Sequence, residues 1–373
     1  MPFADELIGT PTANALVRAI TAAAPGNPLE HLRSAATRLA PLSLRERSDL
    51  FRDALLADLP GSYDSFAATI RQAQHGDAPF SGWLIWPVTS AVVSRAVAEN
   101  TDAAFDDALA LLAALTPRLT AEFAIRGLLD HNLDRALATI EGWTSSDNAD
   151  VRRLASEGTR AFLPWSTRVR GLIDQPRATL PIITALYRDP SEYVRRSVAN
   201  HLNDLSRQNP AIVIETATAW LADPDDHTLR VVSHGLRTLV KKGDPEALAL
   251  LGFIPAESLD IDGPILDSVT VPFGGTARFR ISITNTGPVP ARLAIDYLVH
   301  HSKANGLQTS KTFKLATVTL AAGERFDRIR EHSFRAITTR RYYPGAHAIE
   351  LQVNGVVSGR ADFELLPPAA PVE

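Results

Sequence analysis

The first 250 residues of the chain carry apolar side chains at a helical period. Apolar residues recur at i, i+3, i+4 and i+7 in segments such as DAAFDDALALLAAL (102–115) and PAIVIETATAWLA (210–222). These segments run about 10–16 residues, and short breaks such as Pro60-Gly61 and Gly243-Asp244-Pro245 separate them. The pattern predicts a series of helices over residues 11–250.

A weak internal repeat runs through the second half of this region. The openings of three of the predicted helices resemble one another: Val151-Arg152-Arg153, Tyr193-Val194-Arg195-Arg196 and Thr228-Leu229-Arg230. The offsets from Val151 to Val194 and from Val194 to Leu229 are 43 and 35 residues. That period is typical of two-helix solenoid units of the HEAT type, in which the second helices of successive units line one concave face.

From about residue 254 the period changes to two. Apolar and polar residues alternate over 277–283, 293–299, 349–353 and 363–365, and the turn dipeptides Asn305-Gly306 and Asn354-Gly355 occur between such segments. Roughly seven short strands in about 110 residues fit an immunoglobulin-like sandwich. No cysteine pair marks the sandwich, so this expectation depends on strand spacing alone.

The expected architecture is therefore multidomain. We expect an all-α HEAT-like repeat solenoid over residues 1–252, followed by an all-β immunoglobulin-like sandwich over residues 253–366. The proline-rich end, residues 367–373, is expected to be a disordered tail.

Composition narrows the class of protein. Of the 373 residues, 45% are hydrophobic and 21% are charged, which is ordinary for a globular protein of about two domains. There is no cysteine, which excludes a disulfide scaffold, a zinc–thiolate site and a thiol nucleophile. No apolar run reaches the roughly 18 residues of a membrane span, and the N-terminus has acids where an export signal needs Lys or Arg. We expect a cytoplasmic protein without membrane attachment.

The net charge of −4 hides a basic segment. Residues 1–150 hold 11 basic and 19 acidic side chains, whereas residues 151–207 hold 10 basic and 5 acidic ones. A field acts where its charges are, so the central segment could bind an anionic partner. The alternative is a solvated helix face with an excess of arginine.

Three carboxylates lie among these arginines, and each has an ordinary explanation when taken singly. Glu157 is spaced for surface ion pairs with Arg153 and Arg160. Glu122 follows a candidate N-cap, Thr120, in what would be the first turn of a helix. Asp204 continues the stripe of Arg196 and Asn200, which would usually face solvent.

Trp165 follows a proline in a predicted loop, where a tryptophan is either a packing plug or a stacking platform. In a solenoid the three carboxylates and this ring would converge on one concave surface. Carboxylates repel phosphate, so they would not serve phosphate binding. They would suit a cationic target held beside a phosphate backbone.

The two longest motifs carry a resemblance to a known family. VRRLASEGTR…LPW (151–165) and YVRRSVANHLNDLSRQNP (193–210) resemble the AlkC/AlkD group of bacterial DNA alkylation-repair glycosylases, and especially its AlkC branch. LTAEFAIR (119–126) and HSKANG (301–306) also resemble that branch, part of which carries a C-terminal immunoglobulin-like domain. The family has Pro-Arg after Thr159-Arg160, whereas this chain has Ala161-Phe162, so no phosphate contact is expected at position 162.

The resemblance implies a monofunctional glycosylase that acts on double-stranded DNA containing alkylated bases. Its substrates would be cationic bases, chiefly 3-methyladenine and also 3-methylcytosine, removed without base flipping. It implies no metal and no cofactor, and we expect a monomer. The implied catalytic residues are Glu157 and Asp204 at the sugar and the attacking water, Glu122 in the same cluster, and Trp165 against the lesion.

The implied DNA-binding residues are basic. In the solenoid they are Arg152, Arg153, Arg160, Arg195 and Arg196, and in the sandwich they are Lys303, Arg340 and Arg341. The rival hypothesis is a non-enzymatic HEAT-type scaffold whose immunoglobulin-like module grips a protein partner. Release of bases from methylated DNA discriminates the two.

Overall fold

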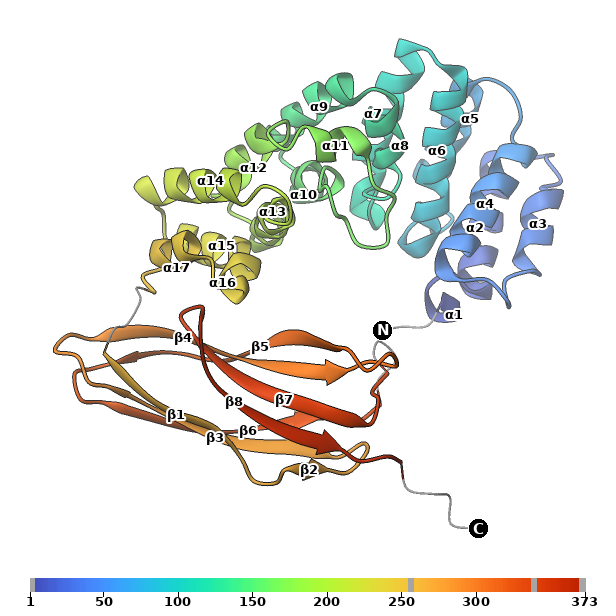
Figure 1. Ribbon diagram of the computed structural model, residues 1–373. Helices are drawn as coiled ribbons and strands as arrows, with labels where there is room; N and C mark the ends of the chain where they lie inside the picture. The colour runs from blue at the N-terminus through green and yellow to red at the C-terminus, as the bar shows by residue number, and fades with distance from the viewer. Residues whose placement is uncertain (1–3, 254–257, 337–340, 369–373) are drawn as a thin grey trace, which may run out of the picture. The chain divides into compact units, whose positions relative to one another are not determined.

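The computed structural model describes residues 4–253, 258–336 and 341–368. It shows an N-terminal helical region followed by a two-sheet β-sandwich, which confirms the predicted fold class (Figure 1). The chain forms two compact units, one of residues 1–213 and 219–235 and the other of residues 214–218 and 236–373.

The helices agree with the periodic segments of the sequence. Among the described residues, none of them combines the length and apolarity that crossing a bilayer requires. Their bounds are α1 (Ala4–Leu7), α2 (Thr10–Ala23), α3 (Glu30–Ala36), α4 (Leu44–Asp58), α5 (Tyr63–His75), α6 (Ile85–Glu99), α7 (Asp102–Leu115), α8 (Ile125–His131), α9 (Leu133–Gly142), α10 (Ala149–Gly158), α11 (Arg170–Asp174), α12 (Leu180–Leu186), α13 (Glu192–Leu205), α14 (Pro210–Ala222), α15 (Thr228–Gly235), α16 (Arg237–Lys242) and α17 (Pro245–Leu250), with 3-10 turns η1 (Gly82–Leu84), η2 (Thr116–Arg118) and η3 (Trp143–Ser145).

Side-chain caps fix where several of these helices begin. The Thr101 hydroxyl accepts a hydrogen bond from the backbone of Ala104 at the start of α7, and Asn132 does the same for Arg135 at the start of α9. Asn148 accepts from the backbone of Asp150 and opens α10. Each cap satisfies a backbone N–H that the helix leaves without a partner.

Helix α13 packs against both α10 and α15, so the three repeat-opening motifs belong to adjacent helices. Their facing sides are fully buried at Leu154, Val198, Leu202 and Val232. Gly235 permits the contact with α15, because a Cβ there would stand 2.7 Å from the Leu202 side chain. This packing brings the ends of α10 and α13 together.

The sandwich consists of a three-stranded sheet in the order β1-β3-β6 and a five-stranded sheet in the order β2-β8-β7-β4-β5. All pairs are antiparallel except β2 with β8. The strands are β1 (Leu259–Leu266), β2 (Thr270–Val271), β3 (Thr276–Asn285), β4 (Ala291–Ser302), β5 (Gln308–Leu320), β6 (Arg325–Ser333), β7 (Gly345–Val353) and β8 (Val356–Leu365).

The core of the sandwich comes from the inward positions of both sheets. Phe279, Tyr297, Phe334 and Leu351 are each at most 2% exposed. Asn354-Gly355 joins β7 to β8 with φ values of 46° and 80°, the left-handed conformation that a two-residue hairpin turn requires.

Helices α16 and α17 pack with the sandwich. The Arg292 guanidinium donates to the Leu251 carbonyl at 2.6 Å, and Gly243 and Gly355 approach so closely that neither has room for a Cβ. By contacts, the second unit thus begins before the expected boundary at residues 252/253. The expected boundary at residues 252/253 therefore remains a prediction of where the two folding domains meet. Of the expected tail, residues 369–373 lie outside the described residues.

Candidate active site

Glu157 lies in the last turn of α10 and is buried, with 6% of its surface exposed. The Ser197 hydroxyl of α13 donates to its Oε2 at 2.7 Å. Its Oε1 accepts from Arg160 and lies 3.7 Å from Arg153. Glu157 is therefore not a surface ion-pairing residue, because contacts from two helices fix its carboxylate.

Asp204 lies near the end of α13 and is 1% exposed. Its Oδ2 accepts from Arg160 Nε at 2.8 Å, and its Oδ1 lies 3.8 Å from Arg207. Burial raises the pKa of Asp204 above its usual range, against the opposing effect of the Arg160 hydrogen bond. The polar residues that share this face of α13 do not all face solvent, because Arg196 is exposed and Asp204 is buried.

Glu122 precedes α8 in a turn, because that helix begins at Ile125. The Thr120 hydroxyl accepts from the Glu122 backbone N–H at 3.2 Å and donates to Glu122 Oε2 at 2.9 Å. Thr120 thus caps the turn rather than the helix. Arg153 pairs with the same Oε2.

The three carboxylates and two arginines form one network, which we call the carboxylate–arginine cluster. Arg153 joins Glu122 to Glu157, and Arg160 joins Glu157 to Asp204. Three adjacent elements thus contribute to one site, as the sequence predicts. Arg207 also approaches Asp204, at 3.8 Å, so each carboxylate of the cluster faces at least one guanidinium group.

Arg126 supports the cluster from behind and was given no role from the sequence. It is 1% exposed, and it donates to the carbonyls of Thr167 at 2.7 Å, Arg160 at 2.7 Å and Gly158 at 3.1 Å. Burial lowers the pKa of Arg126 to about 10, so it stays charged at neutral pH. Its contacts fix the loop that follows α10. The only sequence signal is an arginine inside the apolar run Phe123–Leu128.

His201 is a second buried group that sequence reasoning missed. One ring nitrogen lies 2.9 Å from the Ser156 carbonyl and the other 3.0 Å from the Thr179 hydroxyl. Burial lowers the pKa of His201 to about 4, so the ring is neutral at pH 7. It positions α10 against α13 and supplies no proton at neutral pH.

Trp165 lies in the loop after α10 and is 49% exposed, so it is not a packing plug. Its φ is 59°, and Arg45 donates to its carbonyl. Nearby in the chain, the guanidinium groups of Arg168 and Arg207 lie 5.4 and 4.8 Å from the Phe162 ring. Phe162 thus contacts two guanidinium groups.

The expected phosphate-binding arginines differ in their surroundings. Arg152 makes a two-pronged ion pair with Asp189 at 2.6 and 3.1 Å, and Arg195 donates to the carbonyls of Asp189 and Pro190. Arg153 and Arg160 belong to the carboxylate–arginine cluster. Arg196 is exposed, and no ion pair with another described residue involves it. Arg196 is therefore the best placed of the five to meet a phosphate.

In the sandwich unit, Lys303 and Arg341 line one pocket of about 740 Å³ together with Lys311 and Tyr343. The Arg341 guanidinium stacks over the Tyr343 ring at 5.4 Å. Arg340 lies outside the described residues.

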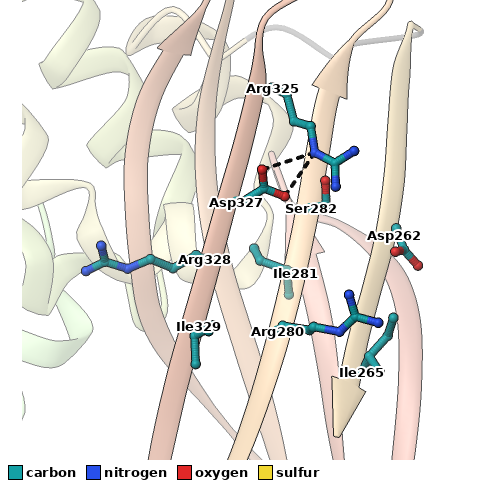
Figure 2. A pocket seen from close by; sticks show the side chains of 9 residues that line it. All are labelled: Asp262, Ile265, Arg280, Ile281, Ser282, Arg325, Asp327, Arg328 and Ile329. Carbon is teal, nitrogen blue, oxygen red and sulfur yellow. Dashed lines mark hydrogen bonds and ion pairs between the residues drawn. The ribbon is translucent and has the colours of Figure 1, made fainter.

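A second pocket of the sandwich, of about 480 Å³, lies on the three-stranded sheet (Figure 2). It holds none of the expected site residues. Its side chains come from β1, β3 and β6, where Arg325 pairs with Asp327 at 3.0 Å. The pairing of β1 with β3 is irregular between Asp262 and Ile265, and both residues line the pocket together with Arg280. Within the described ranges, no group of three or more His, Asp or Glu side chains is arranged to hold a metal ion.

Two family models match the chain. Residues 98–248 match the DNA alkylation repair enzyme family, and residues 260–367 match the C-terminal Ig-like domain described for the uncharacterised protein YhaZ. The chain is 32% identical over 324 residues to the uncharacterized protein YhaZ of Bacillus subtilis (strain 168), covering 87% of this chain and 88% of that protein.

One solved structure is similar over almost the whole chain. It is the alkylpurine DNA glycosylase AlkC of Pseudomonas fluorescens, bound to DNA containing an abasic site analog. The identity is 32%, the TM-score is 0.88, and the match covers 98% of this chain and 100% of that one. The chain is thus a homologue of an alkylpurine DNA glycosylase in both of its units.

Proposed function

We propose a DNA glycosylase activity for this chain, because it belongs to the DNA alkylation repair enzyme family, in the AlkC-like group with a C-terminal Ig-like domain. It removes cationic N-alkylated bases, 3-methyladenine and 3-methylcytosine, from duplex DNA without flipping them. The observation that supports this proposal best is the carboxylate–arginine cluster. DNA as the partner is carried over from the AlkC relative, which was solved with DNA.

The chemistry needs negative charge and no proton donor. A base alkylated at N3 is cationic, so it leaves the sugar as a neutral molecule without help from a general acid. The sugar becomes an oxocarbenium-like cation in the transition state, and a carboxylate beside it lowers the barrier. The buried His201 is neutral at pH 7 and sits behind the cluster, which agrees with a reaction that uses no acid.

The contacts of the three carboxylates suggest how they divide the work. Both oxygens of Glu157 are held, one by Ser197 and the other by Arg160. Among the described residues, no hydrogen bond reaches Glu122 Oε1 or Asp204 Oδ1. These two oxygens are the ones able to accept from the attacking water, while Glu157 adds negative charge from a fixed position.

Trp165 and the arginines complete the site. The exposed Trp165 ring presents its π face to the cationic base or to the sugar, a contact worth about 0.5–2 kcal/mol. Arg196 holds a phosphate, and Lys303 and Arg341 of the sandwich give the duplex a second basic contact. Because one chain supplies every one of these groups, the protein acts as a monomer.

The absence of lysine before residue 241 supports a monofunctional enzyme. Glycosylases that also cut the strand need an amine to form a Schiff base with the sugar. The first lysine of this chain is Lys241, so the carboxylate–arginine cluster has no lysine on its own helices. Water is therefore the nucleophile, and the product is an intact abasic site.

The test is base release from methylated duplex by the purified full chain. We expect free 3-methyladenine and 3-methylcytosine, together with abasic sites that break only on treatment with alkali. Borohydride should trap no protein–DNA adduct. Intact DNA after incubation with a saturating amount of folded protein would support the rival scaffold.

A further inference from the structure

The loop that joins α10 to α11, residues 159–169, carries Trp165 in a tight turn. The Ser166 backbone N–H donates to the Leu163 carbonyl at 3.4 Å, which closes the turn. Pro164 is the second residue of this turn, and Trp165 is the third with a φ of 59°. A turn of this kind favours proline in its second place and a residue with positive φ, usually glycine, in its third.

A tryptophan is an unusual residue for that third place. A positive φ is unfavourable for a bulky side chain, so contacts elsewhere have to stabilise it. Leu29 is the comparison, because its φ is 51° and its side chain is fully buried. Burial stabilises Leu29, whereas 49% of Trp165 is exposed. The left-handed conformation of Trp165 therefore depends more on contacts of its backbone.

Arg45 supplies such a contact from a distant part of the chain. Its guanidinium donates to the Trp165 carbonyl, 120 residues further on. Arg45 lies in the first turn of α4, where Glu46 accepts from the Ser43 backbone N–H at 2.8 Å and fixes the start of the helix. The hydrogen bond thus joins a capped helix end to the loop, at the residue with the unfavourable φ.

The position of Arg45 is unfavourable for its own helix. A positive charge in the first turn opposes the helix dipole. Asp49, four residues further on, pairs with Arg52 at 2.7 Å instead, and no ion pair with another described residue involves Arg45. The charge of Arg45 therefore serves the loop rather than α4.

We propose that Arg45 is a positioning residue for base release, which holds the turn so that the Trp165 ring has one orientation before DNA binds. The proposal deepens the proposed function and rests on it, because Arg45 acts only through Trp165. Arg126 fixes the same loop on either side of the ring, by donating to the carbonyls of Arg160 and Thr167. A ring that is oriented in advance loses little freedom when it meets the substrate.

The alternative for an exposed arginine of the helical unit is a direct contact with a DNA phosphate. Such a contact contributes to the affinity for any duplex and to its salt dependence. A positioning role leaves both unchanged and slows the step in which Trp165 takes part. The structure favours positioning, because the Arg45 guanidinium is directed at a carbonyl of the protein itself.

The first measurement follows the ring in the full chain labelled with fluorotryptophan. Trp165→Ala identifies the fluorine resonance of this ring among those of the five tryptophans. We expect Arg45→Ala to move that resonance toward its position in the denatured chain. Arg45→Lys should restore part of the parent position, because an ammonium group can donate to the same carbonyl. Arg38→Ala, which removes an exposed arginine after α3, is the matched control and should leave the resonance unchanged.

The second measurement is single-turnover release of 3-methyladenine at saturating protein concentration. Arg45→Ala should slow it by about five- to twentyfold, because the ring is no longer held in the productive orientation. Affinity for undamaged duplex and the slope of log K against log salt should stay at their parent values. In the Trp165→Ala background, Arg45→Ala should cause no further loss, since its effect passes through the missing ring.

Three results overturn the proposal. An unmoved fluorine resonance in Arg45→Ala would mean that the ring is oriented without Arg45. A smaller salt slope would assign Arg45 to a phosphate. A loss in the double variant equal to the product of the two single losses would show that Arg45 and Trp165 act independently. Failure of the parent chain to release any base counts against the glycosylase, while the fluorine resonance, which needs no substrate, still decides whether Arg45 orients the ring.

Discussion

Val151-Arg152-Arg153 lies near the start of helix α10, and Val194-Arg195-Arg196 lies at the equivalent place near the start of helix α13. In each helix the first arginine donates through Nη1 to the carbonyls of the residues six and five positions earlier. These bonds tie each helix to the turn before it. The first arginine of each pair therefore has the same structural role in both repeats.

The second arginines differ. Arg153 is half-buried and pairs with Glu122 and Glu157, whereas Arg196 is exposed. We propose that the same sequence position serves the chemistry in one repeat and the binding of the strand in the next. The comparison teaches that a basic motif in a solenoid has to be interpreted one residue at a time.

The largest expected effect concerns the carboxylates at the ends of the two helices. Glu157→Gln and Asp204→Asn should each slow single-turnover release of 3-methyladenine by about ten- to a hundredfold, or 1.4–2.7 kcal/mol of barrier. Each change removes a carboxylate charge that would stabilise the oxocarbenium-like sugar. Affinity for duplex should stay level or rise, because a charge that repels phosphate is gone.

Glu141→Gln is the matched control, because it removes an exposed carboxylate of α9 that lies outside the cluster. It should release the base at the parent rate. Parent-like rates in both cluster variants would show that α10 and α13 do not carry the chemistry.

The next effect separates tethering from binding within α13. Arg195→Ala should lower the free energy of unfolding by about 1–2 kcal/mol, because it removes charged hydrogen bonds to two carbonyls. Arg196→Ala should leave the melting temperature unchanged, since its side chain is exposed. Thermal denaturation of the two variants side by side measures the difference. Equal melting temperatures would mean that the repeat does not depend on its first arginine.

The sequence was sufficient for the fold class because each part of the chain shows one clear period. The 3.6-residue period of the first 250 residues and the two-residue period after residue 254 follow from which faces are buried, and the Asn354-Gly355 turn follows from its need for positive φ. The packing of α16 and α17 with the sandwich was not predictable, because it depends on close backbone approach at Gly243 and Gly355.

The sequence predicted that Glu122, Glu157 and Asp204 would lie together on one surface; the structure brings them together but buries them, and the sequence did not show how they are held. Arg126 and His201 escaped notice because their role depends on burial and on carbonyl groups from other elements. Arg152 and Arg195 were expected at phosphates because a helical period cannot say which of two adjacent arginines faces the preceding turn. Their contacts to carbonyls make a phosphate role least favourable for these two.

A smaller effect tests the binding role of α13 directly. Arg196→Ala should weaken binding to damaged and undamaged duplex alike, and it should reduce the slope of log K against log salt by about 0.9. Arg195→Ala is the comparison, and it should leave the slope unchanged in protein that remains folded. A reduced slope in Arg195→Ala but not in Arg196→Ala would reverse the assignment of the two arginines.

The smallest effect is a shift in pH dependence, and it tests whether the ends of α10 and α13 act as one cluster. Burial raises the pKa of Asp204, and the negative charge of Glu157 adds to that shift. Asp204 stabilises the sugar cation only when it is ionised, so the rate of base release should fall as the pH drops through this raised pKa, above the usual range of aspartate. Single-turnover rates between about pH 4.5 and 8, corrected for base loss without enzyme, measure this fall of the rate at low pH, the acid limb of the profile.

In Glu157→Gln the residual activity should show this acid limb at lower pH, because one charge that opposes ionisation of Asp204 is gone. In Asp204→Asn the limb should disappear. A limb at the same pH in both variants would assign the titration to another group and would break the link between the two helices.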